Sequence, residues 1–245
     1  MSRVIKERSF TGTKSPEPQS YEAPHRELAR KAAREGIVLL KNEGRVLPLK
    51  EGSKVALFGA GAGKTMKGGT GSGDVNEREA VSIYQGMVNA GFQITTADWV
   101  KEYDKIYDDA RIAWRDEILA KAAGNAMKFF NVYSSVPFYP PTGPKAEKTD
   151  TYTAIYVISR IAGEGSDRFN RAGDYYLTDE EKAMLGDICD NYEKVIVAVN
   201  AGGLVDLSFM DEFSNICALL YIVQPGMEGG NAFADVISGK TNPGG

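Results

Sequence analysis

Short apolar runs that alternate with helical segments constrain the fold of this chain more than any other feature. Each run is bounded by turn residues, rich in β-branched side chains and apolar on both faces, which is typical of a parallel strand covered by helices on both sides. Alternation of this kind favours right-handed crossovers, so the sequence predicts an α/β fold with a mostly parallel open sheet and helices on both faces. The runs lie at residues 54–59, 92–97, 153–160, 194–200 and 216–223.

The chain is expected to divide at its first helix. Residues 1–24 are predicted to form an extended N-terminal arm, because residues 11–24 are rich in Pro, Ser and Thr and each proline disfavours helix at the residue before it. Pro24 then suits the first position of a helix that ends at Gly36. Residues 25–245 are predicted to form one domain, long enough to bury a substantial core.

Further helices are predicted between the strands. Residues 76–91 carry one helical pattern and residues 104–124 carry a longer one. Thr178, followed three residues later by Glu181, forms a capping box that should begin the helix before the strand at 194–200. In the longer helix the spacing predicts that the inward side chains are Ile106, Ala110, Ala113, Ile118 and Ala122.

Residues 129–144, FFNVYSSVPFYPPTGP, do not fit the alternation. The segment is aromatic, proline-rich and too long to be an ordinary connection. Two interpretations remain open: a loop that covers a sheet edge or another domain, or a loop that presents aromatic rings to a sugar.

Charge and residue types exclude several classes of function. Lys and Arg number 29 against 33 Asp and Glu, with no long basic run, which argues against a nucleic-acid partner. The only histidine is His25, so neither a zinc site nor a Ser-His-Asp triad is expected, and no metal or cofactor is predicted. No apolar stretch approaches the roughly 18 residues that span a bilayer, and the first ten residues lack the apolar core of a signal peptide. We therefore expect no membrane partner and a cytoplasmic location, where Cys189 and Cys217 would stay reduced.

The segment GAGAGKT at 59–65 suggests a phosphate-binding loop, but its spacing is wrong. A P-loop needs a glycine five residues before the Gly-Lys pair, and Phe58 stands there. In the dinucleotide pattern GxGxxG, Lys64 occupies the place of the third glycine. Nucleotide binding is therefore disfavoured.

Two other glycine-rich segments are candidates for a ligand site. KGGTGSGDV at 67–75 leaves its backbone free to approach a ligand and offers the hydroxyl groups of Thr70 and Ser72, although a flexible turn explains it equally well. IAGEGSDR at 161–168 follows a predicted central strand, where open α/β sheets bind ligands, and sets Glu164 between two glycines. Glu164 is either a general acid in surroundings that disfavour its charge or a solvated loop glutamate.

Taken together, these segments resemble the family 3 glycoside hydrolases, β-glucosidase-like enzymes, from about residue 27 onward. The resemblance implies that residues 25–245 are the α/β sandwich domain of such an enzyme, from a member that carries this domain before its barrel. It also implies truncation at the C-terminal end, because the family pattern would continue after NPGG. The matching pieces, in order, are AREGIVLLKNEGRVLPL, KVALFG, GGTGSGDV, ISRIAGEGSDR, LTDEEKAML leading into VIVAVNAGG, and QPGMEGGNAFADVISGKTNPGG.

The resemblance also implies site residues. In that family the general acid/base comes from the loop that matches ISRIAGEGSDR, which implies Glu164, and the loop that matches GGTGSGDV lies beside the sugar, which implies Ser72 and Thr70 as substrate contacts. The family's nucleophile is an aspartate on a separate (β/α)8 barrel, which is expected to be absent from this chain.

The resemblance therefore predicts part of a retaining β-glycosidase that hydrolyses terminal β-linked sugars, glucose first among them. The expected partners are a β-linked glycoside or oligosaccharide and the barrel domain of the same enzyme, without which the chain should be inactive. A non-catalytic binding or docking module of a carbohydrate-active assembly is the alternative.

Overall fold

A six-stranded sheet with strand order β1-β6-β5-β4-β2-β3 forms the centre of the molecule. The computed structural model describes residues 17–69, 75, 77–162 and 169–245. Among these residues only β1 runs antiparallel to its neighbour, β6, and the other strand pairs are parallel, so the predicted mostly parallel sheet is confirmed. The strands are β1 (Val38–Asn42), β2 (Lys54–Phe58), β3 (Gln93–Ile94), β4 (Thr153–Arg160), β5 (Lys194–Ala201) and β6 (Ile216–Tyr221).

The central strands follow the prediction closely, whereas β3 is much shorter than predicted. β4 and β5 pair over eight residues and are buried along almost their whole length. A strand was predicted over 92–97, but only Gln93–Ile94 belongs to β3. The hydroxyl of Thr96 donates to the Leu57 carbonyl oxygen at 2.8 Å and accepts from the Leu57 amide at 2.7 Å. Thr96 therefore bonds to β2 through its side chain, and helix α5 begins at the next residue.

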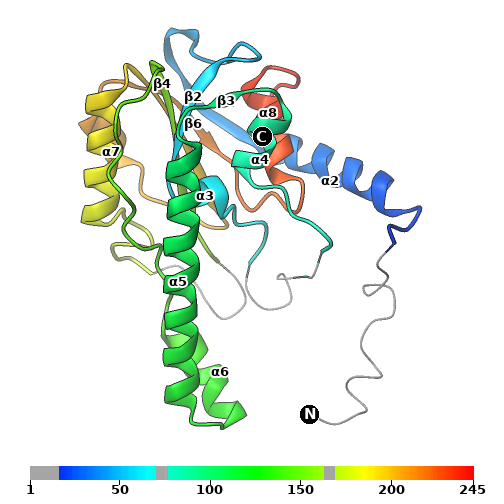
Figure 1. Cartoon of the computed structure of the whole chain (residues 1–245), viewed down its shortest axis with the longest axis vertical. Coiled ribbons are helices and arrows are strands. Elements are labelled where there is room, and N and C mark those ends of the chain that lie inside the picture. Colours follow the sequence, from blue (N-terminus) through cyan, green and yellow to red (C-terminus); the bar gives the residue numbers. More distant parts are fainter. Residues whose placement is uncertain (1–16, 70–74, 76, 163–168) are drawn as a thin grey trace.

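Helices cover both faces of the sheet, as predicted (Figure 1). One apolar cluster joins the sheet to α2, α4 and α8, and a second joins the opposite face to α7. The helices are α2 (Glu22–Gly36), α3 (Ala60–Gly63), α4 (Ile83–Asn89), α5 (Ala97–Ala122), α6 (Ala126–Ser135), α7 (Asp179–Asn191) and α8 (Gly229–Ile237), with 3-10 turns η2 (Glu43–Arg45) and η4 (Ser208–Glu212).

The predicted helix boundaries are confirmed at the start of α7 and the end of α2, whereas α4 begins later and α5 begins earlier than predicted. The capping box of α7 is present, since the Glu181 amide donates to Thr178 Oγ1 at 3.1 Å and the Thr178 amide donates to Glu181 Oε2 at 2.9 Å. α2 ends at Gly36 as predicted but begins two residues before Pro24. Of the predicted arm, residues 1–16 lie outside the described part of the chain. α4 is shorter than the predicted helix over 76–91, because Ser82 caps it by accepting from the Gln85 amide.

The inward face of α5 was predicted only in part. Ile118 and Ala122 are buried, but Ala113 is exposed, so its predicted inward position is wrong. In Figure 1 this half of α5 extends past the sheet, where α6 is its main helical neighbour. The prediction missed the buried side chains of the other half, which are Val100, Tyr103 and Tyr107.

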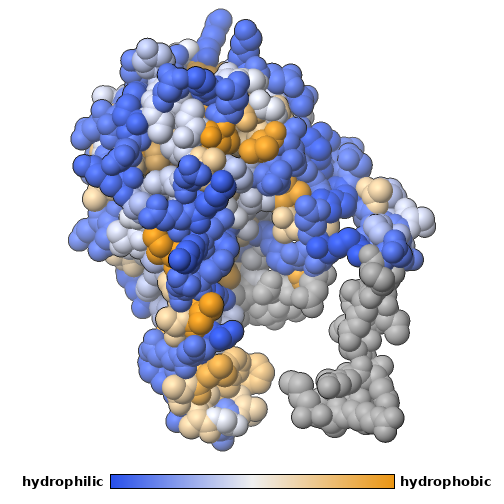
Figure 2. All heavy atoms as spheres, viewed as in Figure 1, coloured by the Kyte–Doolittle hydropathy of each residue, from blue (hydrophilic) through white to orange (hydrophobic). Residues whose placement is uncertain are grey.

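The aromatic segment 129–144 is not irregular throughout. Its first half belongs to α6, which folds back on α5, and apolar side chains gather over this end of the molecule (Figure 2). The second half lies along α5, where Tyr103, Trp114 and Trp99 each donate one hydrogen bond to its carbonyl oxygens. Residues 136–144 therefore cover α5, which is neither a sheet edge nor another domain, so both interpretations of the segment stay predictions.

Two glycines allow α4 and α8 to cross with their backbones in contact. A Cβ on Gly86 would lie 2.0 Å from the Gly230 carbonyl oxygen, and Gly230 packs equally closely on Ser82. Gly86→Ala should therefore lower the free energy of unfolding by about 1–3 kcal/mol, measured by urea denaturation, because a backbone must move to admit the methyl group. Gly186→Ala on α7 is the matched control, since its methyl group would meet no atom closer than 3.8 Å. Equal stability of the two variants would contradict this account of the helix crossing.

No helix in the described ranges combines the length and apolar character that crossing a membrane requires. The cytoplasmic location stays a prediction.

Candidate active site

One buried side-chain amide of β5 joins the segments that follow β2 and β6 at the carboxyl ends of the strands. Asn200, the next-to-last residue of β5, is completely buried. Its Oδ1 accepts from the Met66 amide at 2.6 Å, and its Nδ2 donates to the carbonyl oxygens of Met66 at 3.0 Å and Val223 at 2.7 Å. This side chain therefore holds Met66, the residue before the glycine-rich segment 67–75, against the loop after β6.

The predicted substrate contacts Thr70 and Ser72 lie outside the described residues, but the chain on both sides of them is tied together. Lys67 Nζ donates to the Val75 carbonyl oxygen at 2.6 Å and pairs with Glu77. The Gly226 amide donates to the Lys67 carbonyl oxygen at 2.8 Å. The glycine-rich segment thus starts and ends at the carboxyl edge of the sheet.

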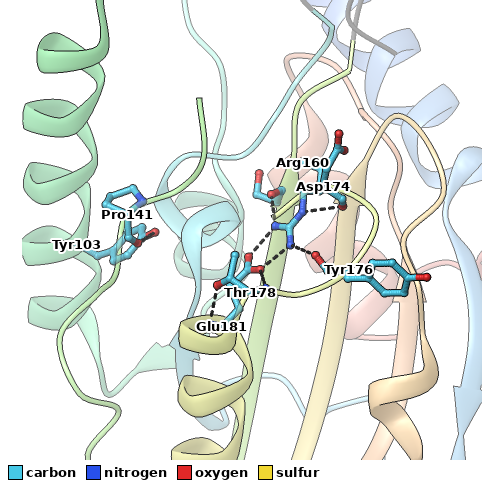
Figure 3. A network of polar contacts seen from close by, with 8 residues as sticks. Tyr103, Pro141, Arg160, Asp174, Tyr176, Thr178 and Glu181 are labelled. Atoms are coloured by element: carbon cyan, nitrogen blue, oxygen red, sulfur yellow. Dashed lines mark hydrogen bonds and ion pairs between the residues drawn. The ribbon is translucent and has the colours of Figure 1, made fainter. Parts of the chain in front are cut away.

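Arg160, the last residue of β4, is buried and organises the chain beyond that strand (Figure 3). Its Nη1 and Nη2 donate to the two carboxylate oxygens of Glu181 at 2.6 and 2.5 Å, a bidentate pair at the first turn of α7. Its Nε donates to the Asp174 carbonyl oxygen at 3.0 Å, and Nη2 also reaches the Tyr176 carbonyl oxygen. One guanidinium group therefore connects the central strand, the segment before α7 and the capping box.

Glu164, the predicted catalytic residue, also lies outside the described residues, whereas both flanks of its segment are held in place. Before it, Gln224 Nε2 donates to the Ala162 carbonyl oxygen at 3.2 Å. After it, the Phe169 amide donates to Asp174 Oδ2 at 2.7 Å. The two flanks, Ala162 and Phe169, are thus bonded near the carboxyl end of β4, the edge where open α/β sheets bind ligands.

Two adjoining pockets lie at this edge. One, of about 310 Å³, lies against residues 133–140 and 169–174, and the other, of about 320 Å³, lies against residues 63–68. Ile161, which precedes the Glu164 segment, lines both pockets. The residues shared by the two pockets are Met66, Tyr107, Arg111 and Ile161.

The glycines of GAGAGKT serve helix packing. A Cβ on Gly61 would lie 2.4 Å from Val157 Cγ1, and one on Gly63 would lie 2.1 Å from Asp104 Oδ1. Lys64 pairs with Asp108 on α5 at 2.8 Å. These contacts explain the glycines without a phosphate.

Asp104 carries a pH-dependent cost in this packing. Its Oδ1 is buried without a hydrogen-bond partner among the described residues, and burial raises the pKa of the carboxyl group, opposed by the charge of Lys64. Because the folded state disfavours the carboxylate, this group lowers the free energy of unfolding once the pH rises above its pKa in the unfolded chain, about 4. Asp104→Asn should therefore raise Tm at pH 7, by an amount that shrinks as the pH falls through the raised pKa of the folded state and is nearly gone below about 4. Asp109→Asn, at an exposed position of α5, is the control; an Asp104→Asn gain that is the same at every pH would contradict this assignment.

The described residues contain no group of three or more His, Cys, Asp or Glu side chains that is arranged to hold a metal ion.

Comparison with known proteins gives a consistent family. The model of the glycosyl hydrolase family 3 C-terminal domain matches residues 37–245. β-Glucosidase A of Butyrivibrio fibrisolvens is 34% identical over 258 residues, which cover 90% of this chain and 28% of that protein.

Solved structures agree with the sequence comparison. The structure of β-glucosidase 3B from Thermotoga neapolitana in complex with glycerol has a TM-score of 0.67 and 34% identity, covering 94% of this chain and 30% of that one. The structure of the same enzyme in complex with glucose gives a TM-score of 0.64 and 33% identity, covering 90% and 30%. This chain therefore spans under a third of the length of these relatives.

Proposed function

Because this chain belongs to glycosyl hydrolase family 3, in which it matches the C-terminal domain, we propose that it is the acid/base-bearing domain of a retaining β-glycosidase. The observation that carries the proposal is the position of the two residues that flank 163–168, Ala162 and Phe169. Both are bonded near the carboxyl end of β4, beside two adjoining pockets. Glu164 stands between them in the sequence, with a glycine on either side.

In the proposed reaction, a nucleophilic aspartate on a (β/α)8 barrel attacks the anomeric carbon while the bond to the leaving oxygen breaks. The Glu164 carboxyl group gives its proton to that oxygen. In the second step the Glu164 carboxylate takes a proton from water, and the water oxygen displaces the aspartate from the anomeric carbon. The carboxyl proton of Glu164 is restored, and the configuration of the sugar is retained.

The proposed substrate is a terminal β-linked sugar, glucose in the first place. The β-glucosidase name of the relative from Butyrivibrio fibrisolvens and the glucose complex of the Thermotoga neapolitana enzyme support this choice. Ser72 and Thr70 are the proposed contacts to the sugar from this domain, because the bonded flanks of their segment lie beside the second pocket. The barrel is the proposed partner domain.

The stereochemistry of the product tests the proposal. The chain joined to its barrel, and not the chain alone, should hydrolyse 4-nitrophenyl β-glucoside, and proton NMR should show β-glucose as the first product. α-Glucose as the first product would exclude a retaining mechanism. If the joined protein bound glycosides but hydrolysed neither β-glucosides nor β-xylosides, the chain would instead be a non-catalytic binding or docking module.

A further inference from the structure

The pocket beside residues 133–140 has two guanidinium groups stacked on aromatic rings. Arg111 Cζ lies 4.1 Å from the centroid of the Trp114 ring, and Arg171 Cζ lies 4.6 Å from that of Phe169. Two further rings, Phe138 and Tyr139, extend these stacks at 4.9 and 5.6 Å. All six residues line the pocket.

The positive charge of this pocket is only partly balanced. Among the described residues, neither Arg111 nor Arg171 forms an ion pair with a carboxylate within 4 Å, and Asp174 is the only acidic residue that lines the pocket. Asp174 Oδ2 already accepts from the Phe169 amide, and Asp108, one turn from Arg111 on α5, pairs with Lys64. A guanidinium group stacked over a ring leaves its N–H edge, which lies in its own plane, free to bind a planar anion.

A buried hydroxyl adds a third polar group. Ser159 is 2% exposed and lines the same pocket, and its Oγ has no hydrogen-bond partner among the described residues. A buried hydroxyl without a partner costs free energy that a polar group of a ligand can recover. Counting described residues alone, the pocket therefore combines aromatic walls, two guanidinium groups without a carboxylate partner and an unsatisfied hydroxyl.

We propose that this pocket binds a planar aromatic group that carries a carboxylate, as the leaving-group part of an aromatic acid glucoside. This proposal rests on the proposed function, since Glu164 as the acid fixes where the scissile bond lies. Ile161 and Phe169, on either side of the Glu164 segment, both line the pocket. The acid that protonates the leaving oxygen lies on the same side of the sugar ring as the leaving group, opposite the nucleophile. The volume of about 310 Å³ is enough for one substituted ring and too small for a long oligosaccharide.

Binding to the chain alone tests the pocket independently of the barrel and of catalysis by Glu164. Isothermal titration with 4-hydroxybenzoate and with its neutral methyl ester should show the acid bound at least about tenfold more tightly, a preference that weakens with added salt. Arg111→Gln and Arg171→Gln should each remove most of this preference and leave the affinity for the ester nearly unchanged. Arg115→Gln is the matched control, since Arg115 lies on the same helix and is paired with Asp116.

The possible outcomes separate this proposal from the proposed function. Equal binding of acid and ester, no binding of either, or an equal loss in Arg115→Gln would overturn the pocket assignment. Binding of the acid with the expected variant effects would support it even if the joined protein hydrolysed no glycoside. In an active joined protein, KM for 4-carboxyphenyl β-glucoside should be lower than for its methyl ester and should rise in Arg171→Gln; equal KM values would count against the pocket and leave the glycosidase assignment intact.

Discussion

Glu164→Gln should lower kcat/KM for an alkyl β-glucoside by about 10²–10⁴-fold in a protein that joins this chain to its barrel. An alkoxide is a poor leaving group, so bond cleavage depends on the proton that Glu164 supplies. A 2,4-dinitrophenolate leaves without a proton, so its glucoside should react with the variant enzyme almost as fast in the first step. Steady-state kinetics over a series of leaving groups measures this difference. The alkaline limb of the pH profile of kcat/KM should also disappear, because it reports loss of the proton on the acid.

Asp167→Asn is the control for this experiment, since it removes a carboxylate from the same segment. Asp167→Asn should lower kcat/KM by a similar small factor for all substrates of the series. If Glu164→Gln slowed good and poor leaving groups alike, Glu164 would be a structural residue and the acid would have to be sought elsewhere. Unchanged activity would favour the docking-module alternative.

The strands β2, β4, β5 and β6 were predictable because burial on both faces leaves a continuous apolar run in the sequence, whereas the half-exposed β1 was not among the predicted runs. The errors in the predicted elements lie where tertiary contacts determine the end of a strand or the face of a helix. β3 ends early because Thr96 bonds to Leu57 through its side chain, which no periodicity indicates. Ala113 was placed inward on helical spacing alone, whereas that part of α5 extends past the sheet. Helix α6 was missed because its aromatic residues precede a proline-rich stretch that is typical of a loop.

The candidate site divides in the same way. Glu164, Ser72 and Thr70 came from glycine-rich segments after strands and from the family resemblance, and their roles stay predictions because they lie outside the described residues. The residues that hold those segments were missed. Asn200 bonds to Met66, far away in the sequence, and Gln224 bonds to Ala162 across two loops. The one available signal was a polar residue at the end of an apolar run, as in VIVAVN and TAIYVISR.

Substitution of Arg160 should have a large effect on stability. The residue is charged, only 3% exposed and hydrogen-bonded to four different residues. Arg160→Met should lower the free energy of unfolding by about 3–5 kcal/mol, since removing one partner of a buried ion pair leaves the other charge uncompensated. The partner is Glu181, whose side chain is 16% exposed. Urea denaturation of the purified chain measures the loss.

The double variant Arg160→Met with Glu181→Gln separates the charge effect from the backbone contacts. Glutamine at this position can still accept from the Thr178 amide, so the capping box is kept while the uncompensated charge is removed. The double variant should therefore recover part of the stability lost by Arg160→Met. It should not recover all of it, because the carbonyl oxygens of Asp174 and Tyr176 lose their donor in both variants. A single variant within about 1 kcal/mol of the wild type would show that water replaces the guanidinium group at no large cost. The flank that holds the Glu164 segment would then depend on Asp174 and Gln224 alone.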